Sequence, residues 1–565
     1  MKTHLTILQN ENSPSEMSGL VPCRRPVSVL PIGHSASRRA ILSRRSLAEA
    51  EAKRRRVSFY PSAFPMSKPV SALLMQLFWA AALVMPVIGT PTAVVLTTLH
   101  SFTGTNDGAS PAAELVQGGD GNFYGTTEGG GTNNLGTVFK ISTIGSLISL
   151  YSFNGNDGEN PTAGLVQGSD GYFYGTTDGL NLELIPNTVE TASGTVFKFG
   201  TNEALTNLYS FFGSAFINGE GECPVAELVQ GSDGYFYGTA EEDGTNGVGT
   251  VFKFSTNEAL TTLHSFNGTD GAFPVAGLVQ GSDGYFYGTT EFTGYQRGGG
   301  NSGFPGTYGT GYGTVFKIST NGVLTTLYAF GTVTNESGDA LDGANPAAAL
   351  VQGSDGYFYG TTSEGGRFGD TAFFNNGTVF KISTNGALPT LYAFDSVTNE
   401  AGIALDGAYP LAGLVQGSDG DFYGTTYLGG TNNLGTVFKI SVNGALTSLY
   451  SFTGGNDGGE PCAGLVLGSD GSFYGTTSAG TNDQGTVFRL TLVPEFQAVT
   501  LTKTTLNLTW STEAGARYQL QHSPDLNSSN WTNLGSPITA TGATLSTTDS
   551  FTNAPQRFYR LVLAP

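Results

Sequence analysis

The chain has 565 residues and a formal net charge of −20; 82 residues are glycine and only 12% are charged. This composition, without any long amphipathic pattern, favours several all-β units over a helical domain. Eleven of the 25 basic residues precede Met66, so the rest of the chain has 14 basic against 41 acidic residues. That balance disfavours binding to nucleic acid or to anionic membranes.

Two segments precede the first β-prone sequence. Residues 1–65 form a basic leader, which we expect to be disordered and absent from the native product. Met66 then opens a segment with the layout of a secretory signal peptide, in which an apolar run from Val70 to Ile88 is followed by small residues. We therefore expect residues 66–93 to be a signal peptide. An uncleaved membrane anchor is the alternative, because an apolar run of 19 residues is long enough to span a bilayer.

An internal repeat occupies most of the chain. Gly-Thr-Val-Phe occurs seven times at intervals of 50 to 64 residues, and each copy follows a block like Gly-Ser-Asp-Gly-Tyr-Phe-Tyr-Gly-Thr-Thr. Units of this size are typical of propeller blades, and each offers the four short β-prone runs that a blade requires. In the second copy these runs are Ala163–Gln167, Tyr172–Thr177, Thr195–Phe199 and Leu205–Phe211. The seven copies begin at Gly136, Gly194, Gly249, Gly313, Gly377, Gly435 and Gly485.

A recurring aspartate lies in the turn between the first two runs of the repeats. Asp-Gly and Asn-Gly pairs supply the positive φ angles that tight hairpins need. We therefore interpret these aspartates as turn formers, because one carboxylate per hairpin is too few for a calcium site. They include Asp170, Asp233, Asp283, Asp355, Asp419 and Asp470.

The two ends of the repeat region predict how it closes. The seventh unit ends at Gly485–Leu492 without the final run, Leu-Thr-x-Leu-Tyr-x-Phe, whereas a run of this kind stands alone at Leu96–Phe102 before the first unit. Pairing of these two segments would leave no open sheet edge. We therefore predict an all-β fold in which residues 94–492 form a seven-bladed β-propeller, with the N-terminal strand closing the last blade.

These motifs also carry a family resemblance. Gly-Ser-Asp-Gly-Tyr-Phe-Tyr-Gly-Thr-Thr, followed by Gly-Thr-Val-Phe-Lys-Ile and Leu-Thr-Thr-Leu-Tyr-x-Phe, resembles the GloVer repeat, the Gloeobacter/Verrucomicrobium type, over about residues 94–492. The resemblance implies an exported bacterial protein of a class whose members carry varied C-terminal anchoring segments. It implies no established activity, so no functional residues are carried over.

Residues 495–565 differ in style from the repeats. Their β-prone runs, around Trp510, Tyr518 and Tyr559, resemble a small fibronectin type III-like β-sandwich. We expect Trp510 and Tyr559 to be core aromatics of this sandwich and not a platform for a ligand.

Few residues after Met66 could carry catalysis or hold a metal. Only three histidines remain, and His100 and His264 occupy a position that is tyrosine in other repeats, so we interpret them as packing residues. We therefore expect no metal, no cofactor and no catalytic residue. The alternative is a polysaccharide-active enzyme, a glycosidase or lyase, that uses two loop carboxylates. The available carboxylates are Glu241, Glu242, Asp243, Glu291, Glu364 and Asp370.

The longest loops gather over blades four to six. Insertions fall either between the second and third strands or between the fourth strand and the next blade, and in a propeller these two loop sets share one face. Their aromatic and cationic side chains suit stacking on sugar rings or anchoring a protein. The alternative is that they only pin long loops to the propeller surface. The candidate binding residues are Phe292, Tyr295, Arg297, Tyr308, Tyr312, Arg367, Phe368, Phe373 and Phe374.

Together these features predict a secreted or cell-envelope protein that is monomeric and has no enzymatic activity. It would bind a glycan or a protein partner on the long-loop face of blades four to six. We expect no binding to nucleic acid, and contact with a membrane only through an uncleaved signal anchor. A further alternative is a surface-layer or adhesion spacer that is attached through the C-terminal sandwich.

Overall fold

The computed structural model is all-β, because the residues that it describes form strands and no helix. The described part of the chain therefore contains no helix that could cross a membrane. The expected leader and signal peptide, residues 1–65 and 66–93, lie outside the described residues. The structure describes residues 94–179, 191–200, 204–213, 221–256, 258–293, 311–336, 338–366, 376–492, 496–502, 505–512, 517–524, 530–541, 544–550 and 557–563.

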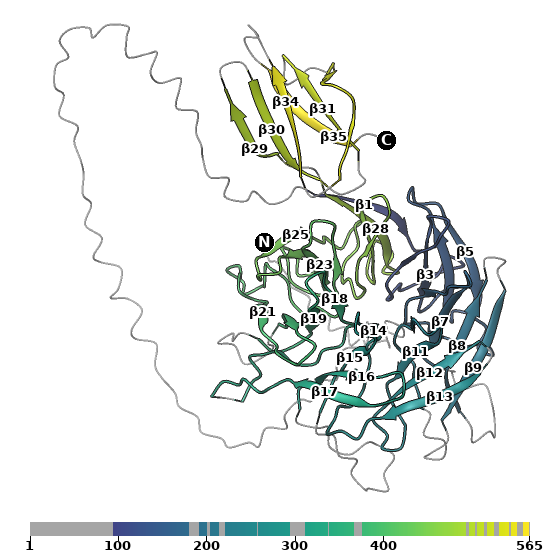
Figure 1. Cartoon of the computed structure of the whole chain (residues 1–565). Helices are drawn as coiled ribbons and strands as arrows, with labels where there is room; N and C mark the ends of the chain where they lie inside the picture. The colour runs from purple at the N-terminus through teal and green to yellow at the C-terminus, as the bar shows by residue number, and fades with distance from the viewer. Residues whose placement is uncertain are drawn as a thin grey trace, which may run out of the picture. The chain divides into compact units, whose positions relative to one another are not determined.

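Seven four-stranded antiparallel sheets lie between residues 94 and 492, and we number them 1 to 7 in chain order (Figure 1). The first strands are β2 (Val116–Gln117), β6 (Val166–Gln167), β10 (Val229–Gln230), β14 (Val279–Gln280), β18 (Val351–Gln352), β22 (Val415–Gln416) and β26 (Val466–Leu467). The second strands are β3 (Phe123–Thr127), β7 (Phe173–Thr177), β11 (Phe236–Ala240), β15 (Phe286–Thr290), β19 (Phe358–Thr362), β23 (Phe422–Thr426) and β27 (Phe473–Thr477).

The third and fourth strands complete each sheet. The third strands are β4 (Thr137–Ile141), β8 (Thr191–Phe199), β12 (Thr250–Ser255), β16 (Thr314–Ile318), β20 (Thr378–Ile382), β24 (Thr436–Ile440) and β28 (Thr486–Leu492). The fourth strands of sheets 1 to 6 are β5 (Leu147–Ser152), β9 (Leu205–Gly213), β13 (Glu258–Ser265), β17 (Leu324–Ala329), β21 (Thr390–Ala393) and β25 (Leu446–Ser451).

The fourth strand of sheet 7 comes from the start of the repeat region. Strand β1 (Val94–Ser101) pairs antiparallel with β28, from Val94 opposite Leu492 to Ser101 opposite Thr486. The pairing predicted for this isolated strand is therefore confirmed. Because β1 covers the free edge of β28, that edge is not left open to pair with another chain.

The sequence Phe-Tyr-Gly-Thr-Thr or a close variant forms the second strand of every sheet, and this strand is buried throughout. Its central glycine is required by packing. In sheet 1, a Cβ on Gly125 would be 2.7 Å from side-chain atoms of both Leu115 and Phe139. Only glycine therefore lets the residues on either side close over the strand.

The same contacts join consecutive sheets. The tyrosine of one second strand lies against the phenylalanine of the next, with ring centroids 3.9–4.2 Å apart. Sheet 7 makes this contact with sheet 1 through Tyr474 and Phe123. Thr476 Oγ1 also donates to Ala113 O at 3.3 Å, as the equivalent threonines do between the other sheets. The order of sheet contacts is therefore cyclic.

The aspartates of the first turn are bound within their own sheets. Asp283 Oδ1 accepts the backbone N–H of Tyr285 at 3.2 Å, and its Oδ2 accepts the hydroxyl of Tyr287 at 2.7 Å. The other six sheets repeat both bonds. The interpretation of these residues as turn formers is confirmed by the bonds that they make.

Two further sheets with a shared core lie between residues 496 and 563. One contains β29 (Phe496–Leu501), β30 (Thr505–Ser511) and β34 (Thr544–Ser550), and the other contains β31 (Arg517–Ser523), β32 (Thr532–Asn533), β33 (Ile538–Thr539) and β35 (Phe558–Leu563). Trp510 is fully buried between them, and Tyr559 packs against the same core. Both aromatics therefore belong to the core, as expected.

Candidate functional site

The residue that follows each second strand occupies one repeated position, which we call the strand-end position. Its backbone N–H donates to the carbonyl of the residue before the proline that opens the sheet, at 2.9–3.3 Å in all seven sheets. That acceptor residue has a φ of 50–56° in every sheet although it is never glycine, so backbone strain recurs there. The strand-end residues are Glu128, Asp178, Glu241, Glu291, Ser363, Tyr427 and Ser478.

The strand-end position changes chemistry along the chain. It is acidic in sheets 1 to 4 and carries a hydroxyl in sheets 5 to 7. Because the backbone hydrogen bond is the same in all seven sheets, only the side chains differ. We call the acidic set, Glu128, Asp178, Glu241 and Glu291, the acidic row.

Glu291 is the most buried carboxyl of the acidic row. It is 8% exposed, and its side chain forms no hydrogen bond or ion pair with any described residue. Burial, followed by the charges of Glu241 and Glu364, raises the pKa of Glu291 to about 8. Burial also raises the pKa of Glu364. At neutral pH the Glu291 carboxyl is therefore largely protonated and can donate a hydrogen bond.

A second buried carboxyl lies beside the acidic row in sheet 2. Glu159 is 5% exposed, and its backbone pairs with Gly179, next to the strand-end residue Asp178. Its side chain has no hydrogen-bond partner among the described residues. Burial and the charge of Asp178 raise the pKa of Glu159 to about 7. This carboxyl is therefore close to half-ionised at neutral pH.

Two more glutamates precede first strands, Glu114 before β2 and Glu227 before β10, and we call them the inner glutamates. A Cβ on Gly164 of sheet 2 would be 1.8 Å from Glu227 Oε1, and a Cβ on Gly464 of sheet 7 would be 2.7 Å from Glu114 Oε2. Each side chain therefore lies over a glycine of the preceding sheet. Burial raises the pKa of Glu227 to about 7, although the Gly164 N–H donates to its carboxylate. Burial and then the charge of Glu227 raise the pKa of Glu114.

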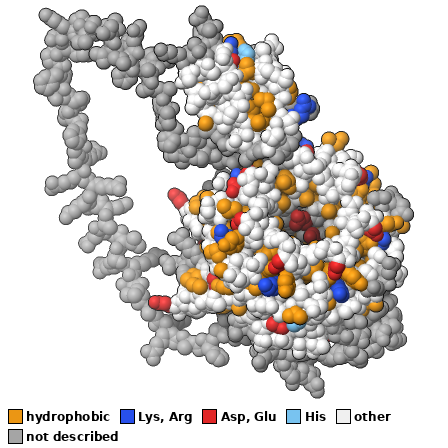
Figure 2. Space-filling view, viewed as in Figure 1, with side chains coloured by type: hydrophobic (Ala, Val, Ile, Leu, Met, Phe, Trp, Pro, Cys, Tyr) orange, Lys and Arg blue, Asp and Glu red, His pale blue; other side chains and the backbone are white. Residues whose placement is uncertain are grey.

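Most basic side chains of the sheets lie away from the strand-end position. Seven of the nine basic residues between 94 and 492 follow Thr-Val-Phe in the third strands. In sheets 1, 2 and 6 this lysine pairs with the turn aspartate at 2.7–2.8 Å, as Lys198 does with Asp170. These pairs lie at the hairpin end of the second strand, opposite its strand-end residue. Figure 2 shows basic side chains spread singly over the face in view and acidic side chains within a hollow.

The acids do not form a ready-made metal centre. Within the described part of the chain, no group of three or more His, Cys, Asp or Glu side chains is arranged to hold a metal ion. What the geometry offers is a set of buried carboxyls with raised pKa values, some able to donate and others to accept hydrogen bonds.

Comparison with protein families identifies the repeat. The sequence matches the Gloeobacter/Verrucomicrobia repeat over residues 89–304 and 342–520. The chain belongs to this family. The resemblance expected from the sequence motifs is thus confirmed, whereas a comparison with curated proteins found no match.

Solved structures resemble this Gloeobacter/Verrucomicrobia repeat protein only distantly. An ulvan lyase of polysaccharide lyase family PL25 is 9% identical, with a TM-score of 0.36 over 72% of this chain and 92% of that one. An arabinoxylan arabinofuranohydrolase of glycoside hydrolase family 43 from Bacillus subtilis is 11% identical, with a TM-score of 0.26 over 83% and 95%. A mutant of AofleA from Arthrobotrys oligospora is 10% identical, with a TM-score of 0.33 over 64% and 91%. We draw no functional argument from similarities at this level.

Two of the nine predicted binding residues of this repeat-family protein lie in its described part. Phe292 packs edge-to-face against Phe273, with ring centroids 6.0 Å apart. The Tyr312 hydroxyl donates to Gly338 O at 2.8 Å and so holds the loop that follows β17. Both contacts are those expected if these aromatics pin loops to the sheets. The other seven, Tyr295, Arg297, Tyr308, Arg367, Phe368, Phe373 and Phe374, lie outside the described residues.

The predicted loop carboxylates separate into two groups. Glu241, Glu291 and Glu364 lie close enough to interact through their charges. Glu242 is exposed, Asp243 is half-buried in the turn after β11, and Asp370 lies outside the described residues. Three of the residues named for the enzyme alternative are therefore brought together at the ends of sheets 3, 4 and 5.

The sequence analysis did not single out Glu159 or the inner glutamates. An alignment of the seven family repeats could have found the inner pair, because Glu114 and Glu227 replace the glycine or alanine of the other five sheets. No sequence signal marks Glu159, because its properties come from burial beside Asp178.

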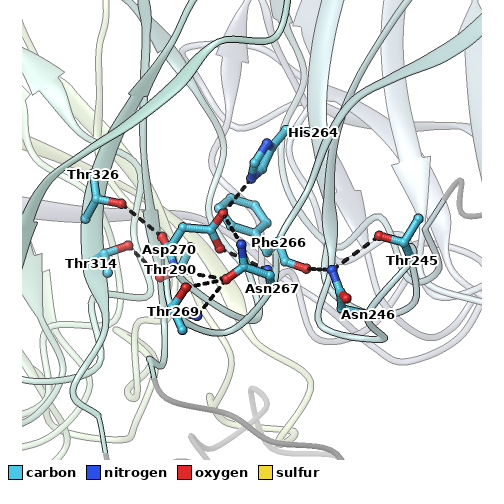
Figure 3. Close-up of polar contacts among 10 residues, drawn as sticks. All are labelled: Thr245, Asn246, His264, Phe266, Asn267, Thr269, Asp270, Thr290, Thr314 and Thr326. Carbon is cyan, nitrogen blue, oxygen red and sulfur yellow. Dashed lines mark hydrogen bonds and ion pairs between the residues drawn. The ribbon is translucent and has the colours of Figure 1, made fainter.

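The histidines of the repeats take the role of tyrosines. His264 Nε2 lies 2.9 Å from Asp270 Oδ2, and its ring packs edge-on against the phenylalanine two residues on (Figure 3). His100 makes the equivalent contacts in sheet 7. Tyrosine at this position does the same in sheet 6, where Tyr450 donates to Asp457 at 2.9 Å. The interpretation of both histidines as packing residues is therefore confirmed.

Proposed function

We propose that this chain is an extracellular or cell-envelope protein that binds a glycan at the acidic row and the adjoining Glu364, without catalysing a reaction. In this proposal residues 94–492 form a seven-bladed β-propeller closed by β1. Residues 495–565 form a fibronectin type III-like sandwich, and residues 66–93 direct export.

The observation that carries the proposal is the largely buried side chain of Glu291, whose carboxyl lies near those of Glu241 and Glu364. A hydroxyl-rich ligand can pair with these carboxyls, because sugar hydroxyls accept from a protonated carboxyl and donate to ionised ones.

The test is binding of the full chain to an array of bacterial, plant and algal polysaccharides. We expect Glu291→Leu to weaken binding of the best glycan by about tenfold or more, since leucine cannot form the hydrogen bonds that we propose between Glu291 and the glycan. Glu400→Leu, which changes an exposed glutamate on the loop after β21, is the matched control and should leave binding unchanged. Failure of the full chain to bind any glycan would rule the proposal out.

Polysaccharide cleavage is the second candidate function, and the raised pKa of Glu291 favours it. A carboxyl with a pKa of about 8 is protonated at neutral pH and can act as a general acid, with Glu241 or Glu364 as the base or nucleophile. The measurements are release of reducing sugars and, for a lyase, the absorbance of unsaturated products. Release that is lost in Glu291→Gln and kept in Glu400→Gln would establish an enzyme in place of a binding protein.

A further inference from the structure

We propose that two copies of this chain associate through strand β29, which pairs edge to edge and antiparallel with its counterpart so that Val499 and Leu501 of each copy cover those of the other. The result is a two-fold dimer in place of the monomer expected from the sequence. The pairing involves only the C-terminal sheets, so it does not depend on glycan binding by the repeats.

Strand β29 forms one edge of its sheet, and its only neighbour among the described strands is β30 (Figure 1). The outer backbone groups of an edge strand are not used by the sheet and can pair with a further strand. Proline, charged side chains and bulges usually protect such an edge, and Ala498–Leu501 contains none of them. The register shift of β29 comes earlier, between Phe496 and Ala498.

Two apolar side chains of β29 face the core side of the sheet and yet are exposed. Val499 lies directly opposite Leu508, and residues in such a pair share a face of the sheet. Leu501 lies opposite Leu506 in the same way. Leu506 and Leu508 are buried in the core between the C-terminal sheets. Val499 and Leu501 are each 58% exposed, so the second sheet covers β30 but does not extend over this part of β29.

The opposite edge of the same sheet, β34, differs from β29. Its core-facing side chains are covered, because Leu545 packs against the core and Asp549 is buried, where it accepts the hydroxyl of Tyr559 at 2.6 Å. Its outward side chains are small and polar. An incoming strand would therefore gain little apolar burial at β34, whereas at β29 it would cover two apolar side chains. The exposed residues of β34 are Thr544, Ser546, Thr548 and Ser550.

A second copy of β29 is the occupant that fits this edge. In an antiparallel pair centred on Thr500, Val499 of one copy lies opposite Leu501 of the other, and the reverse pair forms across the two-fold axis. All four apolar side chains then share one face.

The distribution of charge also favours contact between two C-terminal regions. Strand β29 contains no charged residue, and residues 495–565 have four acidic and four basic residues. Residues 94–492 instead have 37 acidic against nine basic residues. Two C-terminal regions therefore avoid the repulsion that two repeat regions would meet.

The experiment measures the mass of the full chain by light scattering after gel filtration, over a range of concentrations. We expect the mass to rise with concentration toward twice that of one chain. Val499→Lys and Leu501→Lys place a charge opposite an apolar residue of the other copy, so each should weaken the dimer by at least about tenfold. Val323→Lys changes an apolar side chain that is 60% exposed directly before β17. It is the matched control and should leave the dimer unchanged, and thermal unfolding checks that each variant is folded.

Hydrogen exchange of the backbone amides tests which strand pairs. We expect the amides of Ala498–Leu501 to exchange more slowly where the dimer forms than after dilution. A monomer at every concentration would overturn the inference, and so would a dimer that both lysine variants leave intact. Protection of these amides in a monomer would also overturn it, because a segment of the same chain would then cover the strand. Absence of glycan binding by an intact dimer would instead contradict the proposed function alone.

Discussion

Carboxyl groups of the seven sheets differ by the partners that they meet. Burial disfavours the charge of Asp170, but hydrogen bonds from Lys198, Tyr174 and the Tyr172 N–H outweigh it and lower the pKa. Glu291 is buried without such partners, so its pKa rises. Asp170 is therefore fixed as a structural anion, whereas Glu291 keeps an exchangeable proton near neutral pH.

Glu227 should make stability depend on pH. Its pKa of about 7 exceeds the ordinary value of 4.5 because burial disfavours its charge. A raised folded pKa stabilises the protein fully below the unfolded pKa, and this contribution is lost as the pH rises from about 4.5 through about 7. Relative to wild type, we expect Glu227→Gln to raise the free energy of unfolding at about pH 9 by about 1–3 kcal/mol more than at about pH 4. Urea unfolding at both pH values measures the free energy of unfolding, with Glu400→Gln as the control. An equal change in this free energy at both pH values would contradict the raised pKa of Glu227.

Individual strands of the sheets depend on neighbours that are distant in sequence. Strand β1 pairs with β28, and Phe102, directly after β1, is fully buried in the core that sheets 7 and 1 share. This short segment therefore contributes both an edge and a core side chain to the last sheet.

Removing β1 should damage the whole repeat region. A chain that starts at Thr103 exposes the edge of β28 and loses Phe102, whose burial alone contributes about 3–5 kcal/mol. We expect it to aggregate or to unfold at a markedly lower temperature than a chain that starts at Val94. Light scattering after gel filtration and thermal unfolding measure the two effects. A monomeric truncated chain of unchanged stability would mean that sheet 7 does not need its fourth strand.

Contacts between consecutive sheets form a cycle, and the junction between sheets 7 and 1 has the same ring contact as the other junctions. The rings of Tyr474 and Phe123 lie 4.0 Å apart between the last and first sheets, and those of Tyr237 and Phe286 lie 3.9 Å apart between sheets 3 and 4. In an open stack of repeats the end units would instead lack one neighbour.

Equivalence of the junctions can be measured by two substitutions. Phe123 and Phe286 are both fully buried, so Phe123→Ala and Phe286→Ala should each lower the free energy of unfolding by about 3–5 kcal/mol. Tyr285→Ala removes the more exposed ring of the residue that precedes Phe286. It serves as the control, and we expect it to lower the free energy of unfolding by less. A much smaller loss in Phe123→Ala than in Phe286→Ala would show that sheets 7 and 1 are not joined as the others are.

Strand boundaries were predictable where local chemistry decides them. The run predicted at Tyr172–Thr177 is strand β7, which begins one residue later, at Phe173. It was predictable because the preceding turn and the β-prone residues are part of the repeat motif. The run predicted at Ala163–Gln167 contains only the two-residue strand β6. Ala163 is not part of strand β6; its carbonyl accepts a hydrogen bond from Thr126 of the preceding sheet. Sequence pattern alone does not reveal a contact of that kind.

What the sequence determined by itself is the repeated unit: its turns, its buried second strand, the family, and the pairing of the first strand with the last repeat. The turns and the buried second strand follow from interactions within one repeat. The pairing of the first strand follows because the last repeat lacks its fourth strand, whereas a matching run stands alone before the first repeat. The chemistry of the glutamates was decided only by the tertiary structure. The pKa of Glu291 depends on Glu241 and Glu364, which lie 50 and 73 positions away in the chain, and on burial that arises when whole sheets pack together.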